Sequence, residues 1–169
     1  RCLEWPASAG AMRASMSKIF NYTFGNLGSI SVSTPDTPQS VDTGAGNYTG
    51  YAVTSISGTF AGQQVTGVFG ASATIQVVGA ERFDNAIFIN STQGGGTQNG
   101  VGSSFNGIDV PGIDFSLANG NHINLYQTSG GVSSLSYNTL DANSAIVAGG
   151  SGTATITSTN YATAVVPGA

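Results

Sequence analysis

The chain has 169 residues, of which 40 % are hydrophobic and only 7 % are charged, with a formal net charge of −4. This length predicts one domain, and the hydrophobic fraction is large enough for a packed core, which argues against wholesale disorder. After Lys18 the only basic residue is Arg82, so nucleic acid and anionic membrane surfaces, which bind clustered Lys and Arg, are excluded as partners.

The first 18 residues differ in composition from the rest of the chain. They contain three of the four basic residues, the only Trp and the only Cys, Cys2. Ala7 to Lys18 has modest helix propensity without an amphipathic stripe, and residues 1–18 lack the unbroken apolar region of a signal peptide. We therefore predict a non-β N-terminal arm over 1–18 and a β-sandwich domain over 19–169, with no membrane span in either.

From Ile19 onward, apolar and polar residues alternate in short runs separated by Gly, Pro, Asp and Asn, which is the pattern of β-strands and turns. Residues 34–47 are rich in Pro, Asp and Gly and are predicted to be a loop. Ala61-Gly62 is predicted to be the turn of a β-hairpin. The strands expected in the first half of the chain are 19–24, 27–33, 48–60, 63–69 and 72–78.

The second half continues this pattern, with Asn119-Gly120 as its strongest hairpin signal and residues 91–107 as its longest expected loop. No helix is expected after the arm. About ten short strands at regular spacing predict an all-β fold, an antiparallel β-sandwich, and a jelly roll is equally compatible. The strands expected here are 86–90, 112–118, 122–127, 132–137, 152–159 and 161–166.

His122 is the only imidazole in the chain, and no Gly-x-Ser-x-Gly nucleophile elbow accompanies it. It follows the Asn119-Gly120 turn on an expected strand, so we predict a histidine at the surface or rim of the sheet. Cys2 lies too far along the chain for a Cys-His nucleophile to be the expected arrangement. We predict no catalytic residues and no enzymatic activity.

The eight acidic residues are too scattered to indicate a glycosidase, which needs two carboxylates across an aromatic-lined cleft. Some of them offer oxygen ligands for calcium, but no Asp-x-Asp-x-Asp-Gly loop is present. We predict solvated loop carboxylates, no metal site and no cofactor, with Arg82 in a surface ion pair with Glu81 or Asp84. The weighed calcium ligands are Asp84, Asp109, Asp114 and Asp141.

Two further sequence features leave the function open. Asn21, Asn47 and Asn90 each begin an Asn-x-Thr sequon, but chance matches are expected in a chain so rich in Asn and Thr. Gly44-Ala45-Gly46 and Gly94-Gly95-Gly96 are followed by neither a helix nor a lysine, so they predict loops rather than a phosphate-binding cradle.

One region resembles a known family. Tyr51 is followed by Val53-Thr54-Ser55-Ile56-Ser57-Gly58-Thr59, a turn, and Val65-Thr66-Gly67, which is similar to a hairpin of exported bacterial proteins of the PEP-CTERM type. The resemblance covers about residues 20–165 and implies export to the cell surface or matrix without shared catalytic residues. Val166-Pro167-Gly168-Ala169 stands where a Val-Pro-Glu-Pro sorting tail would begin, so that route of anchoring is not implied. Further similar segments are Phe83–Phe88, Gly112–Leu117, Ile123–Tyr126 and Gly152–Thr157.

We expect a non-enzymatic structural protein, extracellular or at the cell surface, that self-assembles as a filament, pilus-like fibre or biofilm-matrix subunit. Identical subunits would exchange a strand or the arm, and low charge leaves little repulsion between copies of this homopolymer. The alternative is a monomeric carbohydrate- or surface-binding β-sandwich, with polysaccharide as partner. Its expected aromatic platform is Tyr48, Tyr51, Tyr126 and Tyr137. A calcium-stabilised adhesin is a third class.

Overall fold

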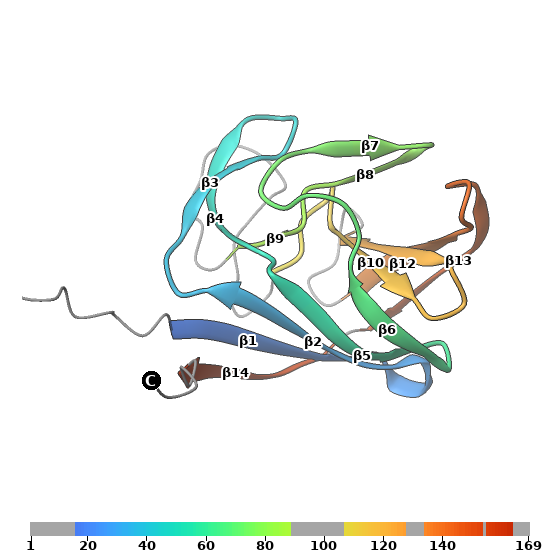
Figure 1. Cartoon of the computed structure of the whole chain (residues 1–169), viewed down its shortest axis with the longest axis horizontal. Helices are drawn as coiled ribbons and strands as arrows, with labels where there is room; N and C mark the ends of the chain where they lie inside the picture. The colour runs from blue at the N-terminus through green and yellow to red at the C-terminus, as the bar shows by residue number, and fades with distance from the viewer. Residues whose placement is uncertain (1–15, 89–106, 128–133, 154, 164–169) are drawn as a thin grey trace, which may run out of the picture.

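The computed structural model describes residues 16–88, 107–127, 134–153 and 155–163 (Figure 1). Within these ranges nearly every residue belongs to a strand or a tight connection, and the only helical element is one 3-10 turn, η1 (Gly25–Leu27). All ladders between named strands are antiparallel, so the predicted all-β, antiparallel sandwich is confirmed. No helix of the described ranges has the length and apolar character needed to cross a membrane.

The strands form one large sheet and two small ones. The large sheet has nine strands in the order β13-β12-β11-β10-β6-β5-β2-β1-β14, beside a β3-β4-β9 sheet and a β7-β8 hairpin. The strands are β1 (Met16–Thr23), β2 (Gly28–Pro35), β3 (Gln39–Asp42), β4 (Asn47–Ala52), β5 (Ser55–Phe60), β6 (Gln63–Val68), β7 (Gln76–Val78), β8 (Glu81–Phe83), β9 (Ala86–Ile87), β10 (Ile113–Leu117), β11 (His122–Gln127), β12 (Ser134–Leu140), β13 (Ile146–Thr153) and β14 (Thr155–Thr163).

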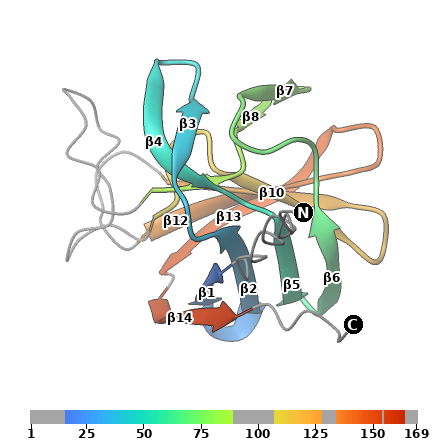
Figure 2. The ribbon, with the colours of Figure 1, turned by 60° about the vertical axis from the view of Figure 1, so that its left-hand side comes forward.

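The large sheet is curled, because β13 and β14 stand at its opposite ends yet are separated by one residue. Two peptide steps span at most about 7.6 Å, whereas eight gaps between flat neighbouring strands would span about 38 Å. β6 forms the other corner, since its first residues pair with β5 and its last with β10. The sheet thus folds into two layers, one containing β14, β1, β2 and β5 and the other β10 to β13 (Figure 2).

The main core fills the space between these two layers. Along β2, Ile30 and Val32 are buried while Ser31 and Ser33 between them are partly exposed, which is the period of two expected for a half-buried strand. Phe60 is the centre of the core, with edge-to-face ring contacts to Phe24, Phe115 and Tyr137 at centroid distances of 5.5, 5.7 and 5.1 Å.

The outer face of the β10–β13 layer is also covered. The β7-β8 hairpin and the β3-β4-β9 sheet lie over it, on the side opposite the main core (Figures 1 and 2). A second, smaller apolar cluster lies in this upper part, formed by Val41, Ala73, Ala86 and Phe88. The alternate residues of β10, β11 and β12 that point away from the main core therefore do not face solvent directly.

Several expected boundaries were wrong. β1 begins at Met16, so the last three residues of the predicted arm belong to a strand, and β3 lies inside the predicted loop 34–47. The expected strand 48–60 is divided at Val53 and Thr54, whose N–H groups donate to Asn85 and Ser33 carbonyls and send β4 and β5 into different sheets. The remainder of the arm and most of the predicted loop 91–107 lie outside the described residues.

Three further strand predictions also differ from the structure. Of the predicted strand 72–78, Gln76–Val78 forms the strand β7, Thr74 makes only an isolated parallel bridge to Asp42, and Ala73 has a positive φ of 62°. β13 was not predicted, because Gly149, Gly150 and Gly152 give this segment the composition of a loop. Of the two expected final strands, 152–159 and 161–166, the first two residues end β13, residues 155–163 form the single strand β14, and residues 164–166 lie outside the described part of the chain.

Candidate functional site

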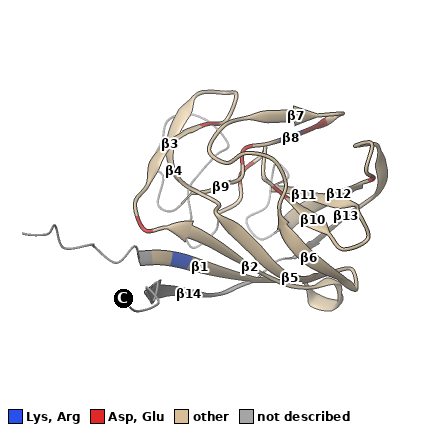
Figure 3. Ribbon diagram, viewed as in Figure 1, with Lys and Arg blue, Asp and Glu red and all other residues tan. Residues whose placement is uncertain are grey.

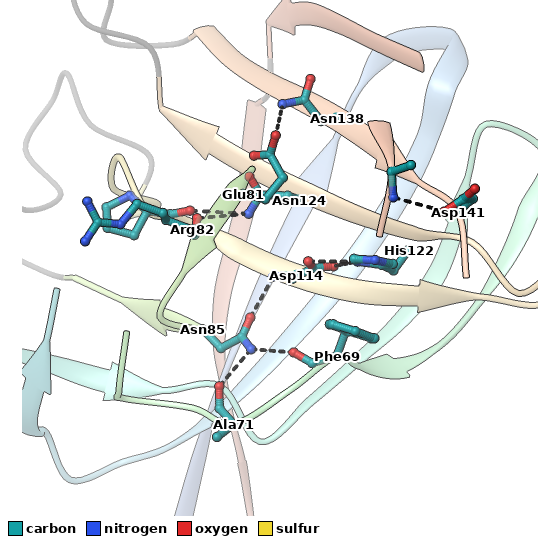
Figure 4. Close-up of polar contacts among 12 residues, drawn as sticks. Phe69, Ala71, Glu81, Arg82, Asn85, Asp114, His122, Asn124, Asn138 and Asp141 are labelled. Atoms are coloured by element: carbon teal, nitrogen blue, oxygen red, sulfur yellow. Dashed lines mark hydrogen bonds and ion pairs between the residues drawn. The ribbon is translucent and has the colours of Figure 1, made fainter. Parts of the chain in front are cut away.

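His122 and Asp114 form a buried pair on the outer face of neighbouring strands β11 and β10. Both carboxylate oxygens of Asp114 lie 2.9 Å from His122 Nδ1, and the two side chains are 0 % and 3 % exposed (Figure 4). The Phe69 ring stacks on the imidazole with 4.0 Å between centroids. Burial raises the pKa of Asp114, against the opposing hydrogen bond and charge of His122. The prediction of a surface or rim histidine was therefore wrong.

Asn85 connects this pair to the covering segment. Its Oδ1 accepts a hydrogen bond from the Asp114 N–H at 2.6 Å, while its Nδ2 donates to the carbonyls of Phe69 and Ala71 at 2.7 and 2.9 Å (Figure 4). Asn85 has a φ of 50°, a conformation that Asn tolerates better than most residues. One buried amide thus joins β10 to the chain that follows β6, with every donor and acceptor of its side chain engaged.

The chemistry open to this pair is limited by its burial. His122 Nε2 is buried and has no hydrogen-bond partner among the described residues. Both side chains are buried and the Phe69 ring lies against the imidazole, so a substrate would reach them only if the segment that contains Phe69 moved. The arrangement accordingly supports a structural polar network that fixes the position of the covering segment.

Asp84 and Asp109 form a second buried polar pair. Asp84 directly precedes Asn85 in the sequence. Asp84 Oδ1 accepts from the Ala86 N–H at 3.1 Å and Asp109 Oδ1 from the Gly112 N–H at 3.0 Å. Burial raises the pKa of Asp84 well above its usual value, and the charge of Asp109 raises it further; burial raises the pKa of Asp109 to about 6. The prediction of solvated loop carboxylates was wrong for Asp84, Asp109 and Asp114.

The weighed calcium ligands do not come together as one set. Asp114 is engaged by His122, and Asp141 lies in its own turn, where hydrogen bonds from the Ala145 and Asn143 N–H groups lower its pKa. Among the described residues no group of three or more His, Cys, Asp or Glu side chains is placed to hold a metal ion. Of these four side chains, only those of Asp84 and Asp109 lie next to each other.

A concave pocket of about 410 Å³ opens above the outer face of β11 and β12. Asn138 Nδ2 donates to Glu81 Oε1 at 2.8 Å (Figure 4) and to the Tyr126 hydroxyl at 3.3 Å, and these bonds join β12 to β8 and β11. Arg82 lines the same pocket, and no carboxylate of the described residues lies within ion-pair distance of it. The predicted surface ion pair between Arg82 and Glu81 or Asp84 was therefore wrong.

The four tyrosines weighed as an exposed platform are dispersed. Tyr137 packs against the core by way of Phe60, whereas Tyr126 lines the pocket. Lys18 Nζ lies 3.9 Å above the ring of Tyr51, and Tyr48 packs against the smaller apolar cluster. None of the four is fully exposed. Of these four tyrosines, only Tyr126 lines the pocket above β11 and β12.

The outer edge of β13 is the other exposed feature with a chemical consequence. β13 pairs with β12 on one side, and no described strand pairs with its other side. Ile146 and Val147 are 48 % and 57 % exposed, and residues 145–151 are exposed throughout. Figure 3 shows that no described residue of this strand is charged. Sequence reasoning missed this edge because its glycines resemble loop composition.

Comparison of the chain with protein-family models, curated proteins and solved structures found no match. The resemblance to PEP-CTERM-type exported proteins therefore stays a prediction from sequence. The function has to be argued from the chain's own geometry.

Proposed function

We propose that this protein is a non-enzymatic structural subunit, extracellular or at the cell surface, that assembles with identical copies through its sheet edges. The observation that carries the proposal is the uncharged, exposed outer edge of β13. A free edge presents a row of unpaired backbone N–H and C=O groups that can pair with another strand. The location is supported by the composition and by the family resemblance described above.

Soluble monomers usually protect such an edge. Charged side chains, proline, very short edge strands or a covering segment are the common devices. β13 has eight residues and neither charge nor proline, and two of its exposed residues are Ile146 and Val147. It does have an irregularity in its pairing with β12 between Thr139 and Leu140, which increases local twist but does not cover the edge.

A second edge lies at the other end of the large sheet. β14 pairs with β1, and no other described strand pairs with it. Pairing of β13 of one copy with β14 of the next is a heterologous contact, because two different surfaces meet. Such a contact leaves one free edge at each end of a growing chain of subunits. It therefore supports an open filament, whereas β13 pairing with itself would stop at a dimer.

Low charge removes the main opposing force. Of the described residues only Lys18 and Arg82 are basic, and Lys18 is already paired with Asp36 at 3.5 Å. Copies that approach edge to edge therefore meet little like-charge repulsion. Residues 1–15 of the predicted arm lie outside the described residues, whereas both edge strands, β13 and β14, lie within them, so we propose assembly by strand pairing.

The test compares two identical substitutions on exposed serines. Ser151→Lys places a charge on the free edge, whereas Ser29→Lys places it on β2, which already has strand partners on both sides. Light scattering and electron microscopy at matched concentrations should show polymers for the unaltered chain and Ser29→Lys. Ser151→Lys should yield a 16.9 kDa species with the same melting temperature as Ser29→Lys.

Two results would overturn the proposal. A single 16.9 kDa particle of the unaltered chain at all concentrations would favour the alternative of a monomeric binding module. Equal polymerisation of the two lysine variants would instead show that assembly does not use the β13 edge.

A further inference from the structure

The pocket above β11 and β12 combines hydrogen-bonding groups of both kinds on fixed strands. Glu81 is 8 % exposed and uses Oε1 to accept from Asn138, so its position is set by a neighbouring strand rather than by solvent. The Tyr126 hydroxyl accepts from the same Asn138 amide, which leaves its own proton available to a ligand oxygen. The pocket volume of about 410 Å³ falls within the usual range for small-molecule sites.

Asn138 keeps this orientation because the residue opposite it on β13 has no side chain. Its register partner is Gly149, and a Cβ atom at that position would lie only 2.7 Å from Asn138 Oδ1. The glycine therefore gives the amide room to turn toward Glu81 and Tyr126. The acceptor carboxylate and the donor hydroxyl are consequently held in place before any ligand arrives, which lowers the entropic cost of binding.

Arg82 supplies a cation that the protein itself does not neutralise. Its guanidinium reaches over Gly44 at the pocket margin, and no carboxylate of the described residues is within 4 Å of it. A guanidinium binds a carboxylate through two parallel hydrogen bonds, which fixes direction as well as charge. One free guanidinium beside one anchored carboxylate fits a ligand that carries a single acid group and several hydroxyls.

The remaining wall is apolar. Val110, which is 43 % exposed, and Pro111 follow Asp109 on the loop that enters β10 and line the same pocket. A pyranose ring has an apolar face of C–H groups and a rim of hydroxyls, so it matches a site with one apolar wall and interleaved donors and acceptors. A phosphate-rich ligand would need more cations than the single Arg82.

We propose that this pocket binds one sugar unit of a carboxylated polysaccharide, such as a uronic acid residue. Arg82 binds the sugar carboxylate, Glu81 and Tyr126 bind ring hydroxyls, and Val110 and Pro111 contact the apolar face of the ring. In an assembled protein such a site would attach each subunit to an acidic matrix polymer. The binding itself does not rest on the proposed function, because all of its residues come from one chain.

The experiment uses the full chain carrying Ser151→Lys, so that ligand binding is measured whether or not the unaltered protein assembles. Titration calorimetry with oligogalacturonate should detect binding, and oligogalactose of equal length, which lacks only the carboxylates, should bind at least about tenfold more weakly, the loss of one charged hydrogen-bonded pair. Raised salt should weaken the first interaction more than the second.

Matched variants assign the binding to the pocket. Arg82→Gln and Lys18→Gln each remove one positive charge, but only the first should reduce oligogalacturonate affinity about tenfold, with oligogalactose binding unchanged. Asn138→Ala should weaken both sugars, and melting temperatures establish that each variant is folded. Absence of binding to both sugars, or equal loss in Arg82→Gln and Lys18→Gln, would overturn the site.

Discussion

The carboxyl groups of Asp84 and Asp109 meet in the interior, where the two residues are 0 % and 1 % exposed. Neither Oδ2 atom has a hydrogen-bond donor among the other described groups. Two ionised carboxylates cannot share such a site, because nothing there offsets their repulsion and their loss of hydration. One proton between them resolves both costs, and the larger rise in the pKa of Asp84 makes it the donor and Asp109 the acceptor.

The first prediction concerns the pH dependence of stability. The pKa of Asp109 is about 6 in the folded protein and 3.8 ordinarily, so the folded state binds protons more tightly than the unfolded state. The stability contributed by protonated Asp109 is therefore complete below about pH 4 and is lost as pH rises through 6. In denaturant unfolding Asp109 alone should give a decline on the order of 3 kcal/mol between these limits, and the raised pKa of Asp84 adds a decline of the same sign.

Asp84→Asn is the control for that prediction. An amide can donate to Asp109 at every pH, so this variant should show a flatter stability profile between pH 4 and 7. Asp36→Asn, on an acid that lies partly exposed beside Lys18, should keep the profile of the unaltered chain. A decline of equal size in Asp84→Asn would contradict the shared proton.

The second prediction concerns His122 and Asp114. His122→Ala removes the partner of a buried carboxyl and leaves a cavity against Phe69, so the free energy of unfolding should fall by about 3–5 kcal/mol. Replacing both residues with apolar side chains, as in His122→Phe with Asp114→Val, should cost less than His122→Ala alone. Denaturant midpoints at constant slope measure both. The coupling would be excluded if the double variant lost as much free energy of unfolding as His122→Phe and Asp114→Val lose separately, added together.

The third prediction compares two glycines of the β5–β6 hairpin. Gly58 has a φ of 125°, and a Cβ atom there would overlap the carbonyl oxygen of Ser29 on β2. Gly62, in the turn, has a φ of 75° with nothing within 4 Å of an added Cβ. Gly62→Ala should therefore cost about 1–2 kcal/mol for backbone conformation alone, whereas Gly58→Ala should cost clearly more. Similar melting temperatures for the two variants would contradict the close approach of β5 to β2.

The fourth prediction concerns the aromatic centre of the core. Phe60 is fully buried and contacts three other rings edge to face. Phe60→Ala should lower the free energy of unfolding by about 3–5 kcal/mol, because it removes apolar contact and leaves a cavity. Thr59→Ala, one residue earlier and exposed, should change it by less than about 1 kcal/mol. Thermal or denaturant unfolding of the two variants provides the comparison.

Parts of the fold could be predicted because they follow from short stretches of chain. The Ala61-Gly62 and Asn119-Gly120 turns connect the strand pairs that the sequence indicates. The alternation in β2 also identifies its buried face. By contrast, the division of the expected strand 48–60 depends on hydrogen bonds to Asn85 and Ser33, which are distant in sequence. No local pattern contains those partners.

The candidate site depends even more on contacts between residues that are distant in the sequence. Alternation along β10 and β11 correctly places His122 and Asp114 on the face away from the main core, and that face would ordinarily meet solvent. Phe69 and Asn85, from the segment that follows β6, pack on this face, so a predicted surface histidine is buried. The meeting of Asp84 with Asp109, and of Glu81 with Asn138, likewise joins residues 25 and 57 positions apart.

The amino-acid order alone determined that this is an antiparallel β protein with few charges, since strand periodicity, turn residues and composition are properties of neighbours along the chain. The tertiary structure decided which polar faces are covered, which carboxyls share a proton and which edge stays open. Those outcomes depend on how the sheet curls and on what segment packs over it, and both are set by contacts between distant residues.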